Sequence, residues 1–185
     1  MIIASLDLET TGLIEPEAPA EYQPRITEIG CVVFENGSSE TFSTFVHPEI
    51  DIPAEVQKIT GITLEMVKDA PNFREAFKEF SKFMTGVDKL ITFNGPGYDL
   101  PVLMFNLKRY NLQYQFPWPR LHLDLMTASS DYLGMQGKTG NKNPKLTELY
   151  KFLFDEDFPA HRALNDAEAT LRCAKELAKR KVIEL

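Results

Sequence analysis

The chain contains little cysteine and no long apolar run. Only two of its 185 residues are cysteine. Cys31 lies in a strand-like segment and Cys173 in a helix-like one, which leaves neither a disulfide framework nor a zinc-binding spacing. Such residues are typical of buried free thiols in a reducing compartment, and we expect a cytoplasmic protein. No segment approaches the roughly 18 to 20 uninterrupted apolar residues that a membrane helix requires.

The N-terminal segment lacks the basic residues of a secretory signal peptide. Residues 1–6 run straight into an acidic motif, so we expect no signal peptide and no membrane partner. Positive charge is also in deficit, because 20 Lys and Arg oppose 27 Asp and Glu, a net charge of −7. This balance argues against a protein that clamps nucleic acid by bulk electrostatics. It does not exclude nucleic acid, since bound metal would cancel part of the negative charge.

Basic residues are nevertheless concentrated in two stretches. Lys138, Lys142 and Lys145 fall in a Gly/Asn-rich segment, and others crowd residues 172–181. We expect most of them to be solvated surface residues. A contact between the 138–145 segment and a phosphate backbone is the alternative.

Length and periodicity predict one domain with alternating structure. The apolar fraction of 43% and charged fraction of 25% are those of an ordinary globular protein. The length favours a single domain over residues 1–185, and no internal repeat is present. Apolar spacing and turn residues predict the elements. The expected strands are 1–8, 26–34, 41–46, 90–93 and 121–125; the expected helices are 53–67 with a break at Gly61, 73–84, one from residue 99, 146–153 and 163–180.

The order of these elements predicts the fold class. A turn at residues 35–38 joins the second and third strands into a hairpin, so the first three strands should form an antiparallel meander. Two strand–helix units follow. This is the pattern of an α/β protein with a mixed five-stranded sheet, three antiparallel strands and then two parallel ones, flanked by helices.

Two acids end the first strand. Asp7 and Glu9 are two residues apart, so their side chains point to the same face of the sheet. Two carboxylates on one face of a buried strand raise each other's pKa unless a cation lies between them. The alternative is a strand end that dips into solvent, with Thr10, Thr11 and Gly12 simply turning the chain. Those three residues also offer backbone N–H groups and hydroxyls beside the acids.

Two further acids lie at helix starts. Asp99 follows the Gly-rich segment 94–98, and capping of the next helix would by itself explain it. Asp166 lies beside the apolar stripe of the last helix, where an acid is costly without a partner. His161 lies five residues upstream, in the loop before that helix. A lone histidine is more often structural, and its fixed distance from Asp166 is what marks it as a candidate.

Other polar residues are not expected to bind metal. His47 and His122 have no partner at ligand spacing, and the acidic run 155–157 should be solvated. Asp124 either caps the next helix, which is the favoured interpretation, or supports the site from behind. The segment 95–97 has neither the lysine nor the spacing of a phosphate-binding loop.

Acids gathered inside a fold are costly unless a cation joins them. The carboxylates of Asp7, Glu9, Asp99 and Asp166, together with His161, therefore predict catalysis by a divalent metal. Hard carboxylate oxygens suit hard cations, and the absence of cysteine clusters argues against structural zinc.

Three motifs in this order resemble those of the DEDDh 3′–5′ exonuclease family, which includes proofreading subunits of bacterial polymerases and phage relatives. They are residues 7–12, residues 94–99 and residues 161–167, and the resemblance spans roughly residues 3–178. The segment 52–63 is similar to the family's helix that meets the terminal nucleotide.

The second motif departs from the family pattern, because Phe93 replaces the usual histidine and the segment to Asp99 is one residue longer. A Gly-flanked bulge can absorb the extra residue, so Asp99 should still reach the site. No polymerase-tethering tail is seen, and a polymerase partner stays an open alternative.

The resemblance implies a ribonuclease H-like fold and an active site with two divalent cations, Mg²⁺ or Mn²⁺. It implies that Asp7 bridges the two ions, and that Glu9 and Asp166 complete the site of the nucleophile-activating ion. Asp99 would support the second ion through water. His161 would be the general base on the attacking water.

The resemblance also implies a substrate. Thr10, Thr11 and Gly12 would grip the 3′-terminal nucleotide, Leu13 would wedge against its base, and Asn94 would contact the substrate. Because this hold is on sugar, phosphate and base face, sequence preference should be weak. The implied reaction is 3′–5′ hydrolysis of DNA, single strands being favoured, with release of nucleoside 5′-monophosphates. The alternatives are a 3′ exoribonuclease or oligoribonuclease and, less favoured, a non-catalytic nucleic-acid-binding module.

Overall fold

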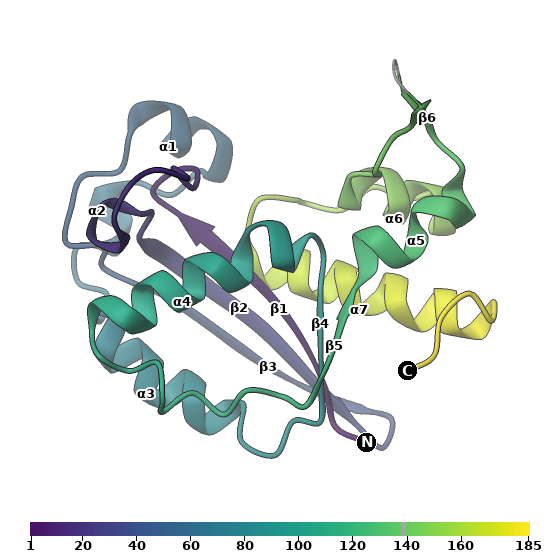
Figure 1. Ribbon diagram of the computed structural model, residues 1–185, viewed down its shortest axis with the longest axis horizontal. Coiled ribbons are helices and arrows are strands. Elements are labelled where there is room, and N and C mark those ends of the chain that lie inside the picture. The colour runs from purple at the N-terminus through teal and green to yellow at the C-terminus, as the bar shows by residue number, and fades with distance from the viewer. Residues whose placement is uncertain (138–139) are drawn as a thin grey trace.

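The computed structural model, which describes residues 1–137 and 140–185, contains a five-stranded mixed sheet (Figure 1). In space the strands follow the order β3-β2-β1-β4-β5, with β1, β2 and β3 antiparallel and β4 and β5 parallel to β1. The predicted mixed sheet is confirmed. The strands are β1 (Ile3–Thr10), β2 (Ile26–Glu35), β3 (Ser38–Phe45), β4 (Lys89–Thr92) and β5 (Leu121–Asp124).

Seven α-helices are described in these two ranges. They are α1 (Ala54–Thr60), α2 (Leu64–Val67), α3 (Phe73–Phe83), α4 (Asp99–Arg109), α5 (Leu125–Leu133), α6 (Leu146–Phe154) and α7 (Ala163–Lys179). None of them is long and apolar enough to cross a membrane. Two 3₁₀ turns, Ala20–Tyr22 and Gly95–Gly97, and a short pair of strands, β6 (Gln136–Gly137) and β7 (Gly140–Asn141), complete the described elements. The sequence pattern did not predict β6 and β7.

The helix boundaries follow local signals. The apolar residues of α3 recur at spacings of three and four, and its first turn is closed by a capping box between Asn72 and Glu75. The expected break after α1 is a left-handed residue, Gly61, with φ of 70°. A glycine adopts this conformation without the steric penalty of a side chain.

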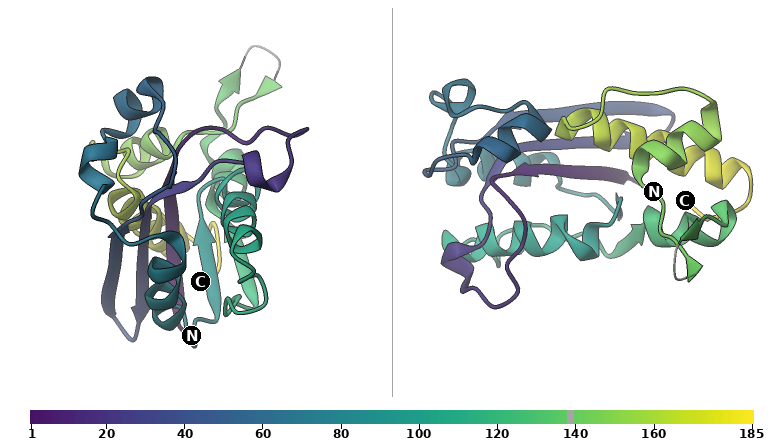
Figure 2. Two further views of the ribbon diagram at one scale, coloured as in Figure 1. Left: turned by 90° about the vertical axis from the view of Figure 1, so that its left-hand side faces the viewer. Right: turned by 90° about the horizontal axis from the view of Figure 1, so that it is seen from above.

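The sheet separates two apolar cores. On one face Ala4, Leu6 and Leu8 of β1 pack with α3 and α4, and on the other face Ile3 packs with α5, α6 and α7. Figure 2 shows α4 and α7 on opposite sides of the sheet. Since strand side chains alternate between faces, Asp7 and Glu9 belong to the face of Ile3, which α7 covers.

A glycine lets α7 lie directly on the sheet. Gly30 of β2 is the cross-strand partner of Asp7, and a Cβ at Gly30 would lie 2.1 Å from the carbonyl carbon of Ala163. No side chain larger than hydrogen fits there, because real Cβ atoms do not approach main chain so closely. The first turn of α7 therefore rests against β2 beside Asp7, and this contact decides where Asp166 lies.

Candidate active site

Three carboxylates converge at the C-terminal end of β1. Asp7 and Glu9 project from β1, and Asp166 projects from the first turn of α7. Each offers an oxygen atom, and these three atoms all lie within 4.8 Å of one another. The structure thus brings together three of the four predicted ligands, from segments about 160 residues apart in the chain.

The three carboxylates have raised pKa values because burial disfavours their charged forms and each feels its neighbours. Burial raises the pKa of Asp7 well above its ordinary value, and the charges of Asp99 and Asp166 raise it further. Burial and the charge of Asp166 raise the pKa of Glu9 to about 8. For Asp166, burial raises the pKa to about 6, although an N–H donated by His161 lowers it.

Asp99 is a buried acid rather than a helix cap. It is the first residue of α4, whose N-cap is Tyr98, and only 4% of it is exposed. Its Oδ1 accepts a hydrogen bond from the Leu8 backbone N–H at 3.1 Å, directly between Asp7 and Glu9. Burial raises the pKa of Asp99, while the Leu8 N–H lowers it. The capping interpretation is therefore wrong. The lengthened loop brings Asp99 to the main chain between Asp7 and Glu9, although its oxygens are not among the three that converge.

His161 lies at the exposed edge of the acid cluster. Its backbone is left-handed, with φ of 67°, and its N–H donates to Asp166 Oδ2 at 2.9 Å. The preceding loop is held by Asn165, whose side-chain amide donates to the Pro159 carbonyl at 2.8 Å. Asp166 thus holds the backbone of His161, and the spacing of these two residues in the sequence had already linked them.

Sequence reasoning missed a fifth acid, Glu28, on β2. Glu28 is 1% exposed and lies opposite Glu9 in the sheet register. It accepts two hydrogen bonds from the Arg162 guanidinium, at 3.0 and 2.8 Å, and one from the Ala163 N–H at 3.1 Å. Glu28 therefore caps α7 from a neighbouring strand, where Arg162 itself provides no side-chain cap. An acid inside the apolar run 26–33 was the available signal.

Asp124 performs both of the functions that the sequence left open. Its side chain caps α5, accepting from the Thr127 hydroxyl at 2.6 Å and the Thr127 N–H at 3.4 Å. It also accepts the Asn94 N–H at 2.7 Å, so it fastens the lengthened loop before Asp99. Asn94 is left-handed and exposed. The sequence predicted that Asp124 caps α5. It could not predict the contact with Asn94, because that contact depends on β4 and β5 being neighbours in the sheet.

An apolar pocket opens beside the acids. It has a volume of about 260 Å³, and Glu9 belongs both to its wall and to the acid cluster. One side is the end of β1 with the following turn, and the other is α1, to which Tyr98 adds a ring. The lining residues are Leu8, Glu9, Thr10, Gly12, Leu13, Val56, Ile59, Thr60 and Tyr98. We call this cavity the apolar pocket.

The turn after β1 is held by its own hydrogen bonds. The Thr10 hydroxyl, the Tyr98 hydroxyl and the Gly12 carbonyl contact one another, and burial raises the pKa of the Tyr98 phenol. Leu13 is 81% exposed at the rim. Sequence reasoning named this turn, but it gave no site role to Tyr98 or to the α1 residues that line the pocket.

Thr11 does not line the apolar pocket. Its N–H donates to the Arg25 carbonyl at 2.9 Å, and its hydroxyl accepts the Arg25 N–H at 3.0 Å. The Thr11 N–H is therefore occupied within the protein in this conformation, and the substrate contact implied for Thr11 stays a prediction.

The residues set aside from the sequence lie apart from the acid cluster. His47 accepts a hydrogen bond from the Glu49 N–H, and His122 contacts the Thr92 hydroxyl. The run 155–157 is exposed, as expected. Lys142 forms an ion pair with Glu148, and Lys138 lies outside the described residues.

The fold and the site together define a class. Carboxylates clustered at the end of the central strand offer hard oxygen donors that suit a cation, and an apolar pocket lies beside them. The model of the RNase T exonuclease family matches residues 5–174, and the chain belongs to this family. The resemblance to DEDDh 3′–5′ exonucleases is confirmed.

Relatives with this domain are larger proteins. The chain is 32% identical to the PolC-type DNA polymerase III of Caldanaerobacter subterraneus over 89% of its own length, and 29% identical to the 3′–5′ exonuclease DinG of Bacillus subtilis over 89%. It spans only 11% and 16% of these two relatives.

A solved structure has the same fold. The nuclease domain of 3′hExo, a DEDDh family member bound to rAMP, superposes with a TM-score of 0.75 at 22% identity, covering 97% of this chain and 92% of that one. The expected ribonuclease H-like architecture is confirmed. Exonucleases of this family use divalent metal ions, and the acid cluster described above is present here.

Proposed function

We propose that the protein is a metal-dependent 3′–5′ exonuclease that removes nucleotides from the 3′ end of DNA, single strands being preferred. The observation that carries the proposal is the position of Glu9, which belongs at once to the three-carboxylate cluster and to the wall of the apolar pocket. A phosphodiester at the acids would leave its terminal nucleoside in the pocket.

The donor set fits divalent cations. Three hard oxygen donors converge from β1 and α7, and such oxygens suit hard divalent cations. We propose that Asp7, Glu9 and Asp166 hold two ions, Mg²⁺ or Mn²⁺, with Asp99 supporting the second. Cations bound there supply positive charge that stabilises the developing negative charge on phosphate and favours attack by water.

The protein groups orient the reaction. His161 takes a proton from the water that attacks phosphorus, a task suited to imidazole near neutral pH. The bond between phosphorus and the 3′ oxygen of the preceding nucleotide breaks. The products are a nucleoside 5′-monophosphate and a strand with a new 3′-hydroxyl, whose proton comes from solvent.

The pocket supports action at a chain end with little base preference. Its wall is almost entirely apolar, and the hydroxyls of Thr10 and Tyr98 are engaged with each other. An apolar surface contacts the face of any base, whereas sequence readout needs hydrogen bonds to base edges. The exposed Leu13 at the rim is available to pack on the base.

DNA is favoured because a similar relative is a DNA polymerase, although the chain spans only 11% of it. RNA is the second candidate, because the solved neighbour is described with rAMP bound. A non-catalytic module is disfavoured, since four buried or half-buried acids would be costly without a cation. The polymerase relative also makes a polymerase partner a reasonable proposal.

The test uses single-stranded DNA and RNA of one sequence, each labelled at the 5′ or the 3′ end, with Mg²⁺ or EDTA. We expect stepwise shortening of the 5′-labelled DNA and immediate release of labelled mononucleotide from the 3′-labelled strand, in Mg²⁺ only. Asp7→Ala and Asp166→Ala should reduce cleavage to a few per cent or less while the thermal unfolding transition persists. Cleavage that survives EDTA, or that starts inside the strand, would refute the proposal.

A further inference from the structure

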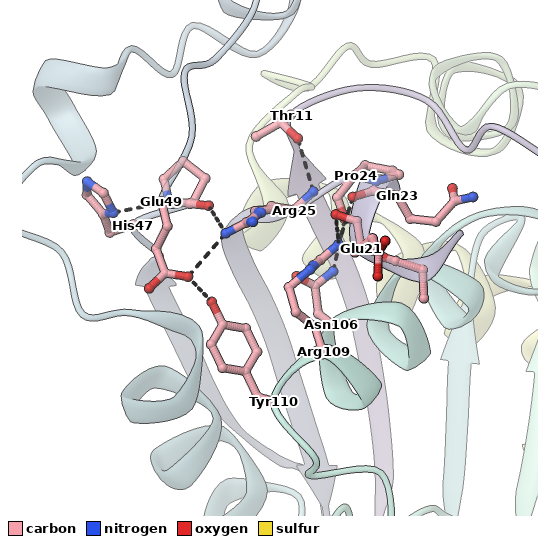
Figure 3. Close-up of polar contacts among 12 residues, drawn as sticks. Thr11, Glu21, Gln23, Pro24, Arg25, His47, Glu49, Asn106, Arg109 and Tyr110 are labelled. Carbon is pink, nitrogen blue, oxygen red and sulfur yellow. Dashed lines mark hydrogen bonds and ion pairs between the residues drawn. The ribbon is translucent and has the colours of Figure 1, made fainter. Parts of the chain in front are cut away.

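Arg25 bonds both to the turn after β1 and to the segment that leads into α1, and Figure 3 shows these polar contacts. The turn and α1 both contribute residues to the apolar pocket. Its main chain pairs with Thr11, which lies between the pocket residues Thr10 and Gly12. The Thr11 N–H donates to the Arg25 carbonyl at 2.9 Å, and the Arg25 N–H donates to the Thr11 hydroxyl at 3.0 Å. The backbone of Arg25 thus fixes the β1 side of the pocket.

The Arg25 side chain reaches the other wall. One guanidinium nitrogen donates to the Pro48 carbonyl at 3.1 Å and to Glu49 Oε2 at 3.1 Å. These residues lie in the segment that leads into α1, six and five positions before the helix begins. Because α1 contributes Val56 and Ile59 to the pocket, the ion pair links the two walls through one residue.

The α1–α2 segment makes few other contacts with the rest of the fold: Phe45 of β3 packs against its apolar cluster, and the His47 N–H donates to the Pro71 carbonyl at 2.9 Å. It encloses a small apolar cluster of its own around Ile52, Ile62 and Val67, separate from the two main cores. In the described part of the chain, neither α1 nor α2 packs extensively on another helix or strand. Hydrogen bonds and ion pairs in the loops therefore help to fix the position of α1, which forms this wall of the pocket.

The segment that precedes Arg25 is fastened to α4. Arg109, the last residue of α4, donates to the carbonyls of Ala20 and Gln23 at 2.8 and 2.9 Å, and Asn106 donates to the Pro24 carbonyl at 3.1 Å (Figure 3). These contacts fasten the segment just before Arg25 to the helix that begins with Asp99.

Glu49 is the anion at the centre of this group. It accepts from Arg25 and from the Tyr110 hydroxyl, and Tyr110 caps the C-terminal end of α4. Burial and the hydrogen bond to Glu49 raise the pKa of the phenol to about 12, so Tyr110 stays a donor. The Arg25 side chain is 21% exposed and that of Glu49 is 44% exposed, so solvent screens the pair in part.

We propose that Arg25, through Glu49, is a positioning residue that sets the separation of the two walls of the apolar pocket and thereby the affinity for the 3′-terminal nucleotide. This inference rests on the proposed exonuclease function. Arg25 does not contact the acid cluster. Its loss should therefore weaken binding of the nucleotide more than it slows the chemistry.

The test compares Arg25→Met and Glu49→Gln with the wild type. We expect KM for a short oligothymidylate and the inhibition constant of dTMP to rise together, by about tenfold for Arg25→Met and less for Glu49→Gln. Turnover should stay within about threefold, and hydrolysis of bis(p-nitrophenyl) phosphate, which has no nucleobase, within about twofold. The effects of the two substitutions should not add in the double variant, because they break one pair.

Controls separate positioning from general damage. Lys68→Met removes an exposed ion pair with Glu65 on the same α1–α2 segment and should change none of these constants. Arg25→Lys keeps the charge and gives a second, milder variant should Arg25→Met unfold. Unfolding temperatures identify variants that are merely unstable.

Three outcomes would overturn the inference. The first is a KM and a dTMP inhibition constant within twofold of wild type in both variants. The second is a fall in turnover and bis(p-nitrophenyl) phosphate hydrolysis equal to the change in KM. The third is additive effects in the double variant. A wild-type protein that shortens no oligonucleotide would instead refute the proposed function itself, so the two failures are distinguishable.

Discussion

At the scale of single residues, the site consists of carboxylates that are costly to keep together. Glu9 and Asp166 have raised pKa values of about 8 and about 6, mainly because burial disfavours their charge. Glu28 differs from these acids. It is the most deeply buried acid on this face, and it forms an ion pair with Arg162. The acids thus divide into Glu28, which is paired with Arg162, and three whose oxygens converge on one another.

His161 should affect turnover rather than assembly of the site. Its backbone contacts Asp166 and its side chain lies at the exposed edge, so His161→Ala leaves the carboxylates in place. We expect kcat to fall by about 100-fold, which is typical for loss of a general base. The Mg²⁺ concentration for half-maximal activity should change less than twofold. Steady-state kinetics with added imidazole tests this, and an unchanged rate would remove the general-base role.

Glu28→Gln should loosen the start of α7. The substitution leaves Arg162 without its anionic partner beside Glu9, and breaking such a buried pair costs about 3–5 kcal/mol in well-buried cases. Because the Arg162 side chain is 42% exposed, we expect a smaller loss of about 1–3 kcal/mol, since solvent can screen the freed charge. The freed guanidinium also competes with cations for Glu9.

The measurement for Glu28→Gln is thermal unfolding together with an Mg²⁺ titration of activity. The unfolding temperature should fall, and the Mg²⁺ concentration for half-maximal activity should rise several-fold. Glu79→Gln, which breaks an exposed ion pair with Lys82, is the matched control and should change neither. Wild-type behaviour of Glu28→Gln would show that the pair does not position α7.

At the scale of elements, the site depends on how closely α7 approaches β2. The contact is main chain to main chain, since a Cβ on Gly30 would lie 2.1 Å from Ala163. On the opposite side of β1, α4 is fixed by the bond between Asp99 and the Leu8 N–H. The position of the acids therefore depends on how two helices pack against the sheet.

Gly30→Ala should test that approach. The added methyl group forces α7 away from β2, at a cost of about 1–3 kcal/mol for overpacking. Asp166 moves with the helix, and displacement of a reacting group by about 1 Å can cost on the order of 100-fold in rate. We expect activity to fall by more than tenfold. Ser43→Ala, at the paired position on β3, should retain full activity, and an active Gly30→Ala would contradict the packing argument.

At the scale of the whole molecule, the net charge of −7 and the unpaired acids make stability depend on pH and cations. Without divalent ions, Glu9 and Asp166 hold protons in the folded state at pH values where the unfolded chain has released them. The folded state thus binds more protons between about pH 4 and 8. Its free energy of unfolding falls as pH rises through that window.

The expected result is a metal-free unfolding temperature that drops by about 5 °C or more between pH 5.5 and 8.5, given about 2–4 °C per kcal/mol for a domain of this size. Mg²⁺ should raise the unfolding temperature more at pH 8.5 than at pH 5.5, because it replaces the missing protons. Scanning fluorimetry in EDTA and in MgCl₂ measures both. The Asp7→Asn variant should show a shallower pH dependence. A metal-free temperature that is highest at pH 8.5 would contradict this account.

Much of this protein is determined locally by its sequence. Alternation along β1 places Asp7 and Glu9 on one face, and helical spacing and turn residues define α3, α4 and α7, because these signals depend on a few neighbouring residues. The three motifs were sufficient to predict the family, and the order of the elements was sufficient to predict the mixed sheet. The sequence alone also identified four of the acids, Asp7, Glu9, Asp99 and Asp166, but it missed Glu28 inside β2.

Only the tertiary structure decided what these residues contact. Glu28 meets Arg162 across 134 positions, Asp124 meets Asn94 because β4 and β5 are neighbours, and Thr11 turns away from the pocket to pair with Arg25. The pocket itself combines β1, α1 and Tyr98. Such contacts follow from strand order, register and the close approach of α7 at Gly30, which no local pattern encodes because each depends on segments far apart in the chain.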